Sequence, residues 1–287
     1  FVHAENGEIL NFLRSECVKK GQLTPHYHYV SRPPFTEAEA VRRAIYLAGQ
    51  TDTPLYIAHM TCREAIAGLQ KAKGTGQRVS GETCTHYLTT TKEVLDNPDF
   101  NEAAKFVCSP ALRDREDCEA LWQALSDGLL TAVSSDHCGI DVAELKQAGR
   151  NDFTQIPNGS PGAGDRLHMV WTEGVCTGKL TRQKFVDVIA TQPAKINGIY
   201  PRKGTLAVGS DADVVIFDPN YEGTVHLADN PNGVDYNLYE GRRQSGRVET
   251  VLLRGQVVVE NAKFVGRYGQ GKFIPANMYA SGYENRN

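Results

Sequence analysis

Three short strand-like runs, each ending in a side chain that can bind a metal ion, limit the possible folds of this chain more than any other feature. They cover residues 1–3, 55–59 and 130–136, and they end in His3, His59 and Asp136. In a parallel α/β barrel the carboxyl ends of the strands converge on one face, so ligands far apart in the sequence can meet there. The pattern predicts a metallohydrolase, and a site with two metal ions needs more ligands than these three.

The first 200 residues alternate between strand and helix patterns, as a barrel of βα units does. Apolar residues at helical spacing predict helices over 7–20, 37–49, 62–73, 118–127, 164–178 and 181–190. Short apolar runs predict strands over 54–59, 78–82, 106–108 and 130–134. The predicted fold class is therefore α/β, with a TIM-like barrel that is only partly contained in this chain.

The composition changes after Pro201, where turns and short strands replace the helices. Residues 214–217 predict a strand, and residues 248–253 and 256–259 predict a hairpin around the turn at Arg254-Gly255. We expect three parts: residues 1–200 from the carboxyl-terminal part of the barrel, 201–265 from a small β-sandwich domain, and 266–287 as a tail. The tail is expected to be extended or to pack on a neighbouring subunit.

Charge and cysteine usage narrow the possible partners and the compartment. The formal net charge of −3 and the lack of a long basic run argue against nucleic acid or an anionic membrane as a partner. A small, neutral or mildly polar substrate fits better. The seven cysteines are scattered and include no Cys-x-x-Cys pair, which favours the reducing cytoplasm. No apolar run approaches the roughly 18 residues that a membrane span needs.

The ligand types predict the chemistry. Neutral imidazole and carboxylate suit Zn²⁺, and a site with an open position lowers the pKa of bound water to about 7. For any single histidine, the alternative to a ligand role is a polar or core-lining residue that has a hydrogen-bond partner. His137 should not share an ion with Asp136, because neighbouring side chains on a strand point to opposite faces. His86 is expected to line the pocket or to be structural. Cys138 is either a nucleophile beside His137 or, as we favour, part of the pocket wall.

Several motifs together resemble the dihydropyrimidinases and D-hydantoinases of the amidohydrolase superfamily, along essentially the whole chain. The motifs are His3-Ala4-Glu5-Asn6-Gly7, Gly81-Glu82-Thr83-Cys84, Ser109-Pro110 with Leu112-Arg113, Ser135-Asp136-His137-Cys138, residues 153–159 and residues 201–219. The resemblance implies a TIM-like barrel beside a β-sandwich, a binuclear zinc centre and hydrolytic opening of a cyclic amide. It also implies a homotetramer.

The resemblance assigns roles to five residues. His3 and His59 resemble the two histidines that hold the more exposed metal ion. Asp136 resembles the aspartate that binds the other ion and passes a proton to the leaving nitrogen. Ser109 and Asn158 resemble residues whose main-chain groups bind the imide edge of the substrate, although Asn158 followed by glycine is by itself a common turn pair.

The chain also departs from the family pattern. The family uses a His-x-His pair and a carboxylated lysine upstream of the residue matched by His3, and neither is in this chain. We therefore expect a partial sequence of an active enzyme, or one piece of a complex with a second chain, ahead of a free 287-residue catalyst.

Other readings stay open. The alternatives are allantoinase or another cyclic amidase, and a non-catalytic dihydropyrimidinase-related binding protein, which has no need of His3, His59 and Asp136. The sequence does not decide between dihydrouracil and 5-substituted hydantoins. Nor does it choose between Zn²⁺ and Mn²⁺ or Co²⁺.

Overall fold

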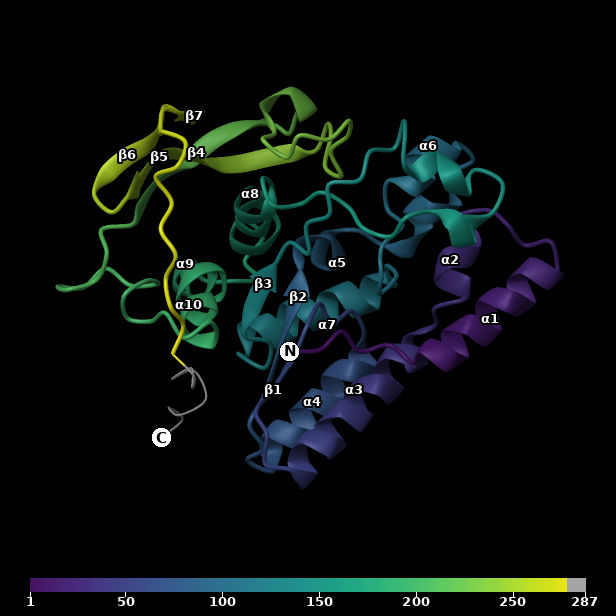
Figure 1. The fold of residues 1–287 in the computed structure, drawn as a ribbon. Coiled ribbons are helices and arrows are strands. Elements are labelled where there is room, and N and C mark those ends of the chain that lie inside the picture. Colours follow the sequence, from purple (N-terminus) through teal and green to yellow (C-terminus); the bar gives the residue numbers. More distant parts are fainter. Residues whose placement is uncertain (278–287) are drawn as a thin grey trace. The chain divides into compact units, whose positions relative to one another are not determined.

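The computed structural model describes residues 1–277, which fold into two compact units (Figure 1). The first unit comprises Phe1–Arg166 together with Val225–Gly241. The second comprises Leu167–Thr224 and the chain from Arg242 onward. Each unit has a sheet of its own, so we describe them separately.

The first unit is built on a parallel sheet of three strands in chain order, β1 (Leu55–Ile57), β2 (Val79–Cys84) and β3 (Ala132–Ser134). Val2 forms a parallel bridge with Ile57, so the start of the chain runs beside β1. Parallel neighbours need a crossover connection, and a helix lies between β1 and β2 in the sequence. The residues that follow β1 and β3 therefore emerge at the same edge of the sheet.

The helices of the first unit include four longer ones. They are α1 (Gly7–Lys19), α3 (Pro34–Gln50), α4 (Arg63–Gly74) and α7 (Arg115–Ser126). The shorter helices and turns are α2 (His26–Val30), α5 (Thr85–Thr89), α6 (Phe100–Ala104), η1 (Lys92–Asp96), η2 (Lys146–Gly149), η3 (Phe153–Gln155) and η6 (Leu227–Asp229).

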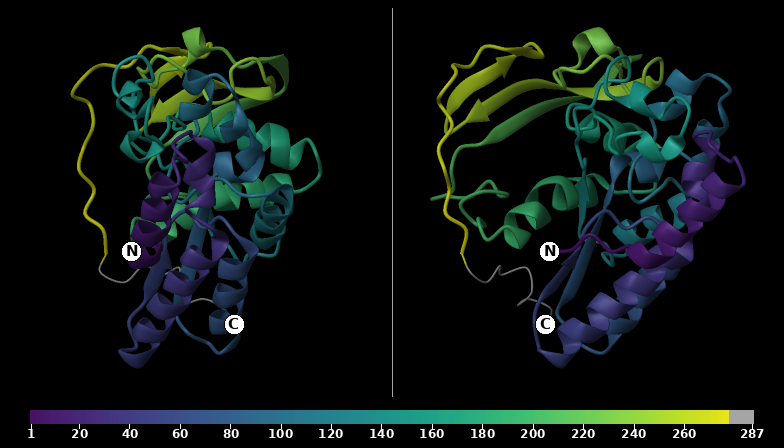
Figure 2. Two further views of the ribbon diagram at one scale, coloured as in Figure 1. Left: turned by 90° about the vertical axis from the view of Figure 1, so that its right-hand side faces the viewer. Right: turned by 45° about the vertical axis from the view of Figure 1, so that its right-hand side comes forward.

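Local sequence explains where the longer helices begin, and apolar packing holds them on the sheet. The Asn6 side chain accepts a hydrogen bond from Ile9 N at 3.1 Å and so caps α1. Helix α3 begins at a proline, which suits the first helical position. Helices α3 and α4 lie side by side, and α4 also packs on β2 (Figure 1, Figure 2). Gly81 of β2 makes room for the Met60 side chain, because a Cβ there would lie 2.6 Å from Met60 Sδ.

The second unit combines short helical segments with an antiparallel sheet. The segments are α8 (Arg166–Val170), the π-helical turn η4 (Trp171–Val175), α9 (Arg182–Val186), a second π-helical turn η5 (Asp187–Thr191) and α10 (Gln192–Ile196). The sheet order is β4 (Val214–Thr224), β5 (Arg243–Leu253), β6 (Gln256–Glu260) and β7 (Lys263–Phe264).

An aromatic cluster joins the helical segments of the second unit to its sheet. The Trp171 ring lies 5.3 Å from the Phe185 ring and 4.8 Å from the Phe217 ring, centroid to centroid. Beside it, Thr172 Oγ1 accepts a hydrogen bond from Ser245 N at 3.0 Å and donates one to Ser245 O at 3.1 Å. The turn η4 is thus fixed on the sheet by an apolar contact with β4 and by polar contacts with β5.

Most predicted elements are present, and one is wrong. The helices predicted over 7–20 and 62–73 are α1 and α4, and the predicted hairpin is β5 and β6. The strand predicted over 106–108 does not form. Instead, the Val107 carbonyl accepts hydrogen bonds from Gly159 N and Lys146 Nζ. Burial of this apolar run reflects its place in a packed loop, which periodicity does not distinguish from a strand.

The larger architecture is described only in part. Residues 1–277 contain a three-stranded parallel sheet with its helices and a four-stranded antiparallel sheet, while the closed barrel, the sandwich and the domain boundaries 1–200 and 201–265 stay predictions. Within the predicted tail, residues 266–277 form neither helix nor strand, and 278–287 lie outside the described residues. No helix in the described part of the chain is long and apolar enough to cross a membrane.

Candidate metal centre

Two of the predicted metal ligands, His3 and His59, are in contact. His3 follows the bridge of Val2 to β1, and His59 follows the end of β1. The distance from His3 Nδ1 to His59 Nε2 is 3.0 Å, and the rings meet edge to face at 69°. The neighbouring parallel segments therefore bring together two side chains that are 56 positions apart in the sequence.

This pair fits two ligands of a divalent ion. Metal–nitrogen distances of about 2.0–2.1 Å place two ligating nitrogens roughly 3 Å apart. Burial lowers the pKa of His59, an effect that the Asp136 carboxylate partly opposes, and the lowered pKa favours the neutral ring that can bind a metal. Its Nδ1 is buried without a hydrogen-bond partner. Residues 1–277 nevertheless contain no group of three or more His, Cys, Asp or Glu side chains arranged to hold a metal.

Glu5, which the sequence analysis did not single out, supports His3. Its Oε2 atom lies 3.1 Å from His3 Nε2 and 2.7 Å from Arg32 Nη1. Burial raises the pKa of Glu5, but the contacts with His3 and Arg32 outweigh it, and the pKa lies below its usual value. A carboxylate on the second ring nitrogen fixes the orientation of a ligating histidine. The signal was the His-x-Glu spacing, because alternate residues of an extended segment share a face.

The backbone is left-handed at both strand-end candidates. The φ angle is 34° at His59 and 44° at Asp136. Non-glycine residues with positive φ are uncommon and often mark functional sites. Asp136 is exposed and follows β3. Its negative charge acts to raise the pKa of His59, but the structure does not bring Asp136 into contact with the histidine pair.

A buried ion pair anchors the segment that follows His59. Glu37 accepts hydrogen bonds from Thr61 N at 2.7 Å and from Arg113 Nη2 at 3.1 Å. Arg113 Nε donates to Thr61 Oγ1 at 2.8 Å. Both charged side chains are almost fully buried, at 2% and 4% exposed. The position of His59 is therefore tied to α3 and to the loop before α7.

The two predicted substrate-binding residues are also in contact. Ser109 Oγ donates a hydrogen bond to Asn158 Oδ1 at 2.9 Å. Ser109 is half-buried and Asn158 is exposed. The segment after Asp136 lies beside them, because Cys138 N donates to Ser160 O at 3.0 Å. Three loops that are separate in the sequence thus lie together.

The remaining candidates have more ordinary environments. His137 Nδ1 accepts hydrogen bonds from Gly162 N at 3.3 Å and Ala163 N at 3.5 Å. Burial raises the pKa of Cys138, which does not favour a thiolate nucleophile. His86 is buried, its Nε2 lacks a partner, and burial lowers its pKa to about 3. Its role as a pocket-lining or structural residue stays a prediction.

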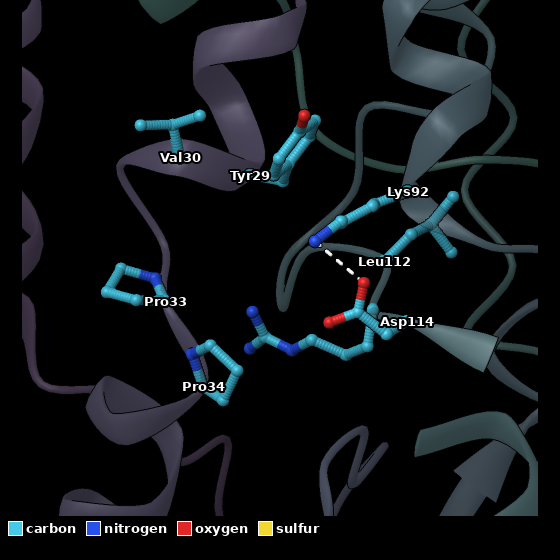
Figure 3. A pocket seen from close by; sticks show the side chains of 8 residues that line it. Tyr29, Val30, Pro33, Pro34, Lys92, Leu112 and Asp114 are labelled. Atoms are coloured by element: carbon cyan, nitrogen blue, oxygen red, sulfur yellow. Dashed lines mark ion pairs between the residues drawn. The ribbon is translucent and has the colours of Figure 1, made fainter. Parts of the chain in front are cut away.

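A separate cavity of about 180 Å³ lies elsewhere in the first unit (Figure 3). Inside it, Lys92 Nζ forms an ion pair with Asp114 at 2.7 Å and lies 5.4 Å from the centre of the Tyr29 ring. None of the predicted site residues lines this cavity, so we do not assign it to the candidate centre. Its walls are Tyr29, Val30, Pro33, Pro34, Lys92, Leu112, Arg113 and Asp114.

The sequence profile described as "Amidohydrolase family" matches residues 55–258. This range covers most of the chain and includes His59, Asp136 and both substrate-loop candidates. The chain belongs to the amidohydrolase family.

Within that family, the chain is similar to hydantoinases and dihydropyrimidinases. It is 47% identical to a D-hydantoinase of Ralstonia pickettii over 278 residues, which cover 97% of this chain and 60% of that protein. It is 39% identical to a dihydropyrimidinase of Arabidopsis thaliana, covering 95% of this chain and 51% of that protein. A crystal structure of dihydropyrimidinase from Brevibacillus agri matches with a TM-score of 0.95 and 44% identity, over 97% of this chain and 60% of that one. The chain thus spans between about half and three fifths of the length of these relatives.

Proposed function

We propose that this chain carries part of the active site of a metal-dependent cyclic amidase. The substrates are dihydropyrimidines or 5-substituted hydantoins, and the products are N-carbamoyl amino acids. The observation that carries the proposal is the 3.0 Å contact between His3 and His59 at neighbouring strand ends. The similarity to D-hydantoinases and to a dihydropyrimidinase supports the same substrate class.

The amidohydrolase family is metal-dependent, and we propose two Zn²⁺ ions for the complete site, with Mn²⁺ or Co²⁺ as substitutes. His3 and His59 would hold one ion, and Asp136 would bind the other. When bound, the metal supplies a Lewis acid and lowers the pKa of water. The remaining ligands implied by the resemblance, a His-x-His pair and a carboxylated lysine, are not among the 287 residues.

The side chains of this chain then have distinct tasks. Glu5 orients His3 through its contact with Nε2. Asp136 accepts a proton from the attacking water and delivers it to the ring nitrogen as the carbon–nitrogen bond breaks. Main-chain groups of Ser109 and Asn158 bind the imide edge and fix the orientation of the ring. The water oxygen ends in the new carboxylate, and the nitrogen remains in the carbamoyl group.

We further propose the context in which this site works. The first unit would contribute to a TIM-like barrel and the antiparallel sheet of the second unit to a β-sandwich, in a cytoplasmic homotetramer. The structural match to solved relatives supports this architecture, with a TM-score of 0.93 and 48% identity to a D-hydantoinase over 95% of this chain.

The direct test is ring opening by the protein in its native assembly. We expect the protein to hydrolyse 5,6-dihydrouracil or a 5-substituted hydantoin. The measurement is the amount of N-carbamoyl product, determined by chromatography. Asp136→Asn should lower kcat by at least about a hundredfold, because proton transfer by a positioned group contributes roughly 10²–10⁴. Faster opening of allantoin than of both substrates would replace the proposal with the allantoinase alternative.

A further inference from the structure

Lys146 is a fully buried lysine that the proposed mechanism does not use. Its Nζ donates to three backbone carbonyls, Ala104 O at 2.8 Å, Val107 O at 3.3 Å and Gly159 O at 2.8 Å. An ammonium has three donors, so its hydrogen-bonding capacity is saturated. Within residues 1–277 it forms no ion pair with a carboxylate. Lysines are rarely fully buried without such a pair, so this arrangement needs a reason.

Two of the three carbonyls that Lys146 holds belong to the substrate loops, and the third, Ala104 O, lies at the end of α6. Val107 precedes Ser109 by two residues, and Gly159 directly follows Asn158. Gly159 N also donates to Val107 O at 3.0 Å, so the two segments are joined directly and through the ammonium. The contact between Ser109 and Asn158 lies at the end of this connection.

The same segment also touches the loop that follows Asp136. A Cβ on Gly159 would lie 2.5 Å from Cys138 Cβ, and the backbone there has a φ of 131°. Gly159 is thus a residue whose backbone must come very close to its neighbour. The position of Gly159 therefore affects the spacing between the substrate loops and the strand end that carries Asp136.

We propose that Lys146 is a positioning residue for substrate binding. Its ammonium fixes segments 107–109 and 158–159 at the separation at which Ser109 and Asn158 bind the imide edge of the ring. The inference rests on the proposed function for the identity of the substrate. Lys146 touches no reacting atom and acts only through the loops that it holds.

A lysine that merely fills the core would behave differently when replaced. Its loss would lower stability and leave the kinetic constants of the folded protein unchanged. Loss of a positioning residue raises KM more than it lowers kcat, because binding must then order the two loops. The ratio of the two kinetic effects therefore separates the two roles.

The test compares Lys146→Met with Lys73→Met in the native assembly. Lys73 is a matched control, because its Nζ also donates to a backbone carbonyl, Leu129 O at 2.5 Å, away from the substrate loops. For Lys146→Met we expect KM for 5,6-dihydrouracil or the hydantoin to rise about ten- to a hundredfold, since small misplacements have effects of this size. Lys73→Met should stay within about twofold, the ordinary effect of a remote change.

Hydrogen exchange adds a measurement that does not depend on activity. The Gly159 amide should exchange faster in Lys146→Met than in the wild type, whereas its exchange rate should be unchanged in Lys73→Met. The exchange rates of amides in β1 and β2 should be unchanged in both variants. If Lys146→Met does not fold, Lys146→Gln, which keeps two hydrogen-bond donors, takes its place. It should raise KM and the exchange rate of the Gly159 amide in the same direction, by smaller factors. An unchanged KM, or equal effects in the Lys73 control, would overturn the proposal.

The two hypotheses can fail separately. If the wild-type protein opens none of the rings, the proposed function fails, and faster exchange at Gly159 would still show that Lys146 orders the loops. If the wild-type protein is active while Lys146→Met shows neither a KM change nor faster exchange, only the positioning role is overturned.

Discussion

At the scale of single residues, the least expected feature is the carboxylate of Glu5 on the second nitrogen of His3. The side chain is 2% exposed and also binds Arg32, so it has little freedom to move. A histidine held in this way presents its other nitrogen in one direction. The predicted ligand pair therefore depends on a residue that is not itself expected to bind metal.

We predict that Glu5→Gln weakens metal binding by about ten- to a hundredfold, the usual effect of removing such a partner of a ligating histidine. The side-chain amide of the glutamine lacks the negative charge of Glu5, which favours a proton on His3 Nε2 and so leaves Nδ1 free to bind the metal. The measurement is a competition titration against a chelator of known affinity. Glu8→Gln, an exposed change in the first turn of α1, is the control and should not alter the affinity. Equal affinities in all three proteins would contradict the role of Glu5.

Lys146 gives a second prediction, on the pH dependence of stability. Burial lowers its pKa from 10.5 to about 8. Between these values the unfolded chain binds more protons than the folded one, so this residue makes stability rise with pH. The titratable groups facing it are Cys108, Cys138 and Tyr236, and burial raises the pKa of each.

The measurement is urea unfolding of the wild-type protein and Lys146→Met at pH 7 and pH 9. The stability of the wild type relative to the variant should be greater at pH 9, because the cost of burying the charge falls as Lys146 deprotonates. A difference that is constant or smaller at pH 9 would contradict the lowered pKa.

At the scale of elements, the buried pair of Glu37 and Arg113 joins α3 to the loop before α7. We predict that Arg113→Met lowers the free energy of unfolding by about 3–5 kcal/mol, because it leaves a buried carboxylate unpaired. The exposed pair of Arg43 and Glu39 within α3 is the control. Arg43→Met should cost no more than about 0.5 kcal/mol. Similar losses in the two variants, measured by urea unfolding, would show that the buried pair does not anchor these elements.

The elements also show what the sequence could predict. Helical periodicity predicts α1 and α4, and the Arg254-Gly255 turn predicts the hairpin of β5 and β6. The strand-end pattern predicts that His3 and His59 meet, since neighbouring parallel strands end at one edge. The prediction of a strand over 106–108 is wrong, because an apolar run indicates burial and does not determine backbone hydrogen bonding.

Long-range polar contacts are the part that the sequence could not predict. Glu37 and Arg113 are 76 positions apart, and neither belongs to a recognisable local motif. Likewise, nothing near Lys146 in the sequence shows that its ammonium is surrounded by backbone carbonyls. Such contacts follow from how the elements pack, which periodicity and composition do not specify. The ligand roles of His3, His59 and Asp136 and the substrate roles of Ser109 and Asn158 stay predictions.

At the scale of the whole molecule, the chain belongs to the amidohydrolase family and spans about three fifths of the length of the D-hydantoinase of Ralstonia pickettii. Its first unit brings His3 into contact with His59 and Ser109 into contact with Asn158, while Asp136 follows β3 without contacting the histidine pair. No three of its described metal-binding side chains are grouped to hold an ion.

The most direct test of the central claim is the metal content of the native assembly, measured by plasma mass spectrometry together with the intact mass of every chain present. We predict close to two zinc ions per complete site, and a substantial loss of metal in His59→Ala. His226→Ala, at an exposed histidine paired with Glu240, should retain the wild-type content. Absence of metal from the wild-type assembly, or unchanged content in His59→Ala, would contradict the assignment of His59 as a metal ligand.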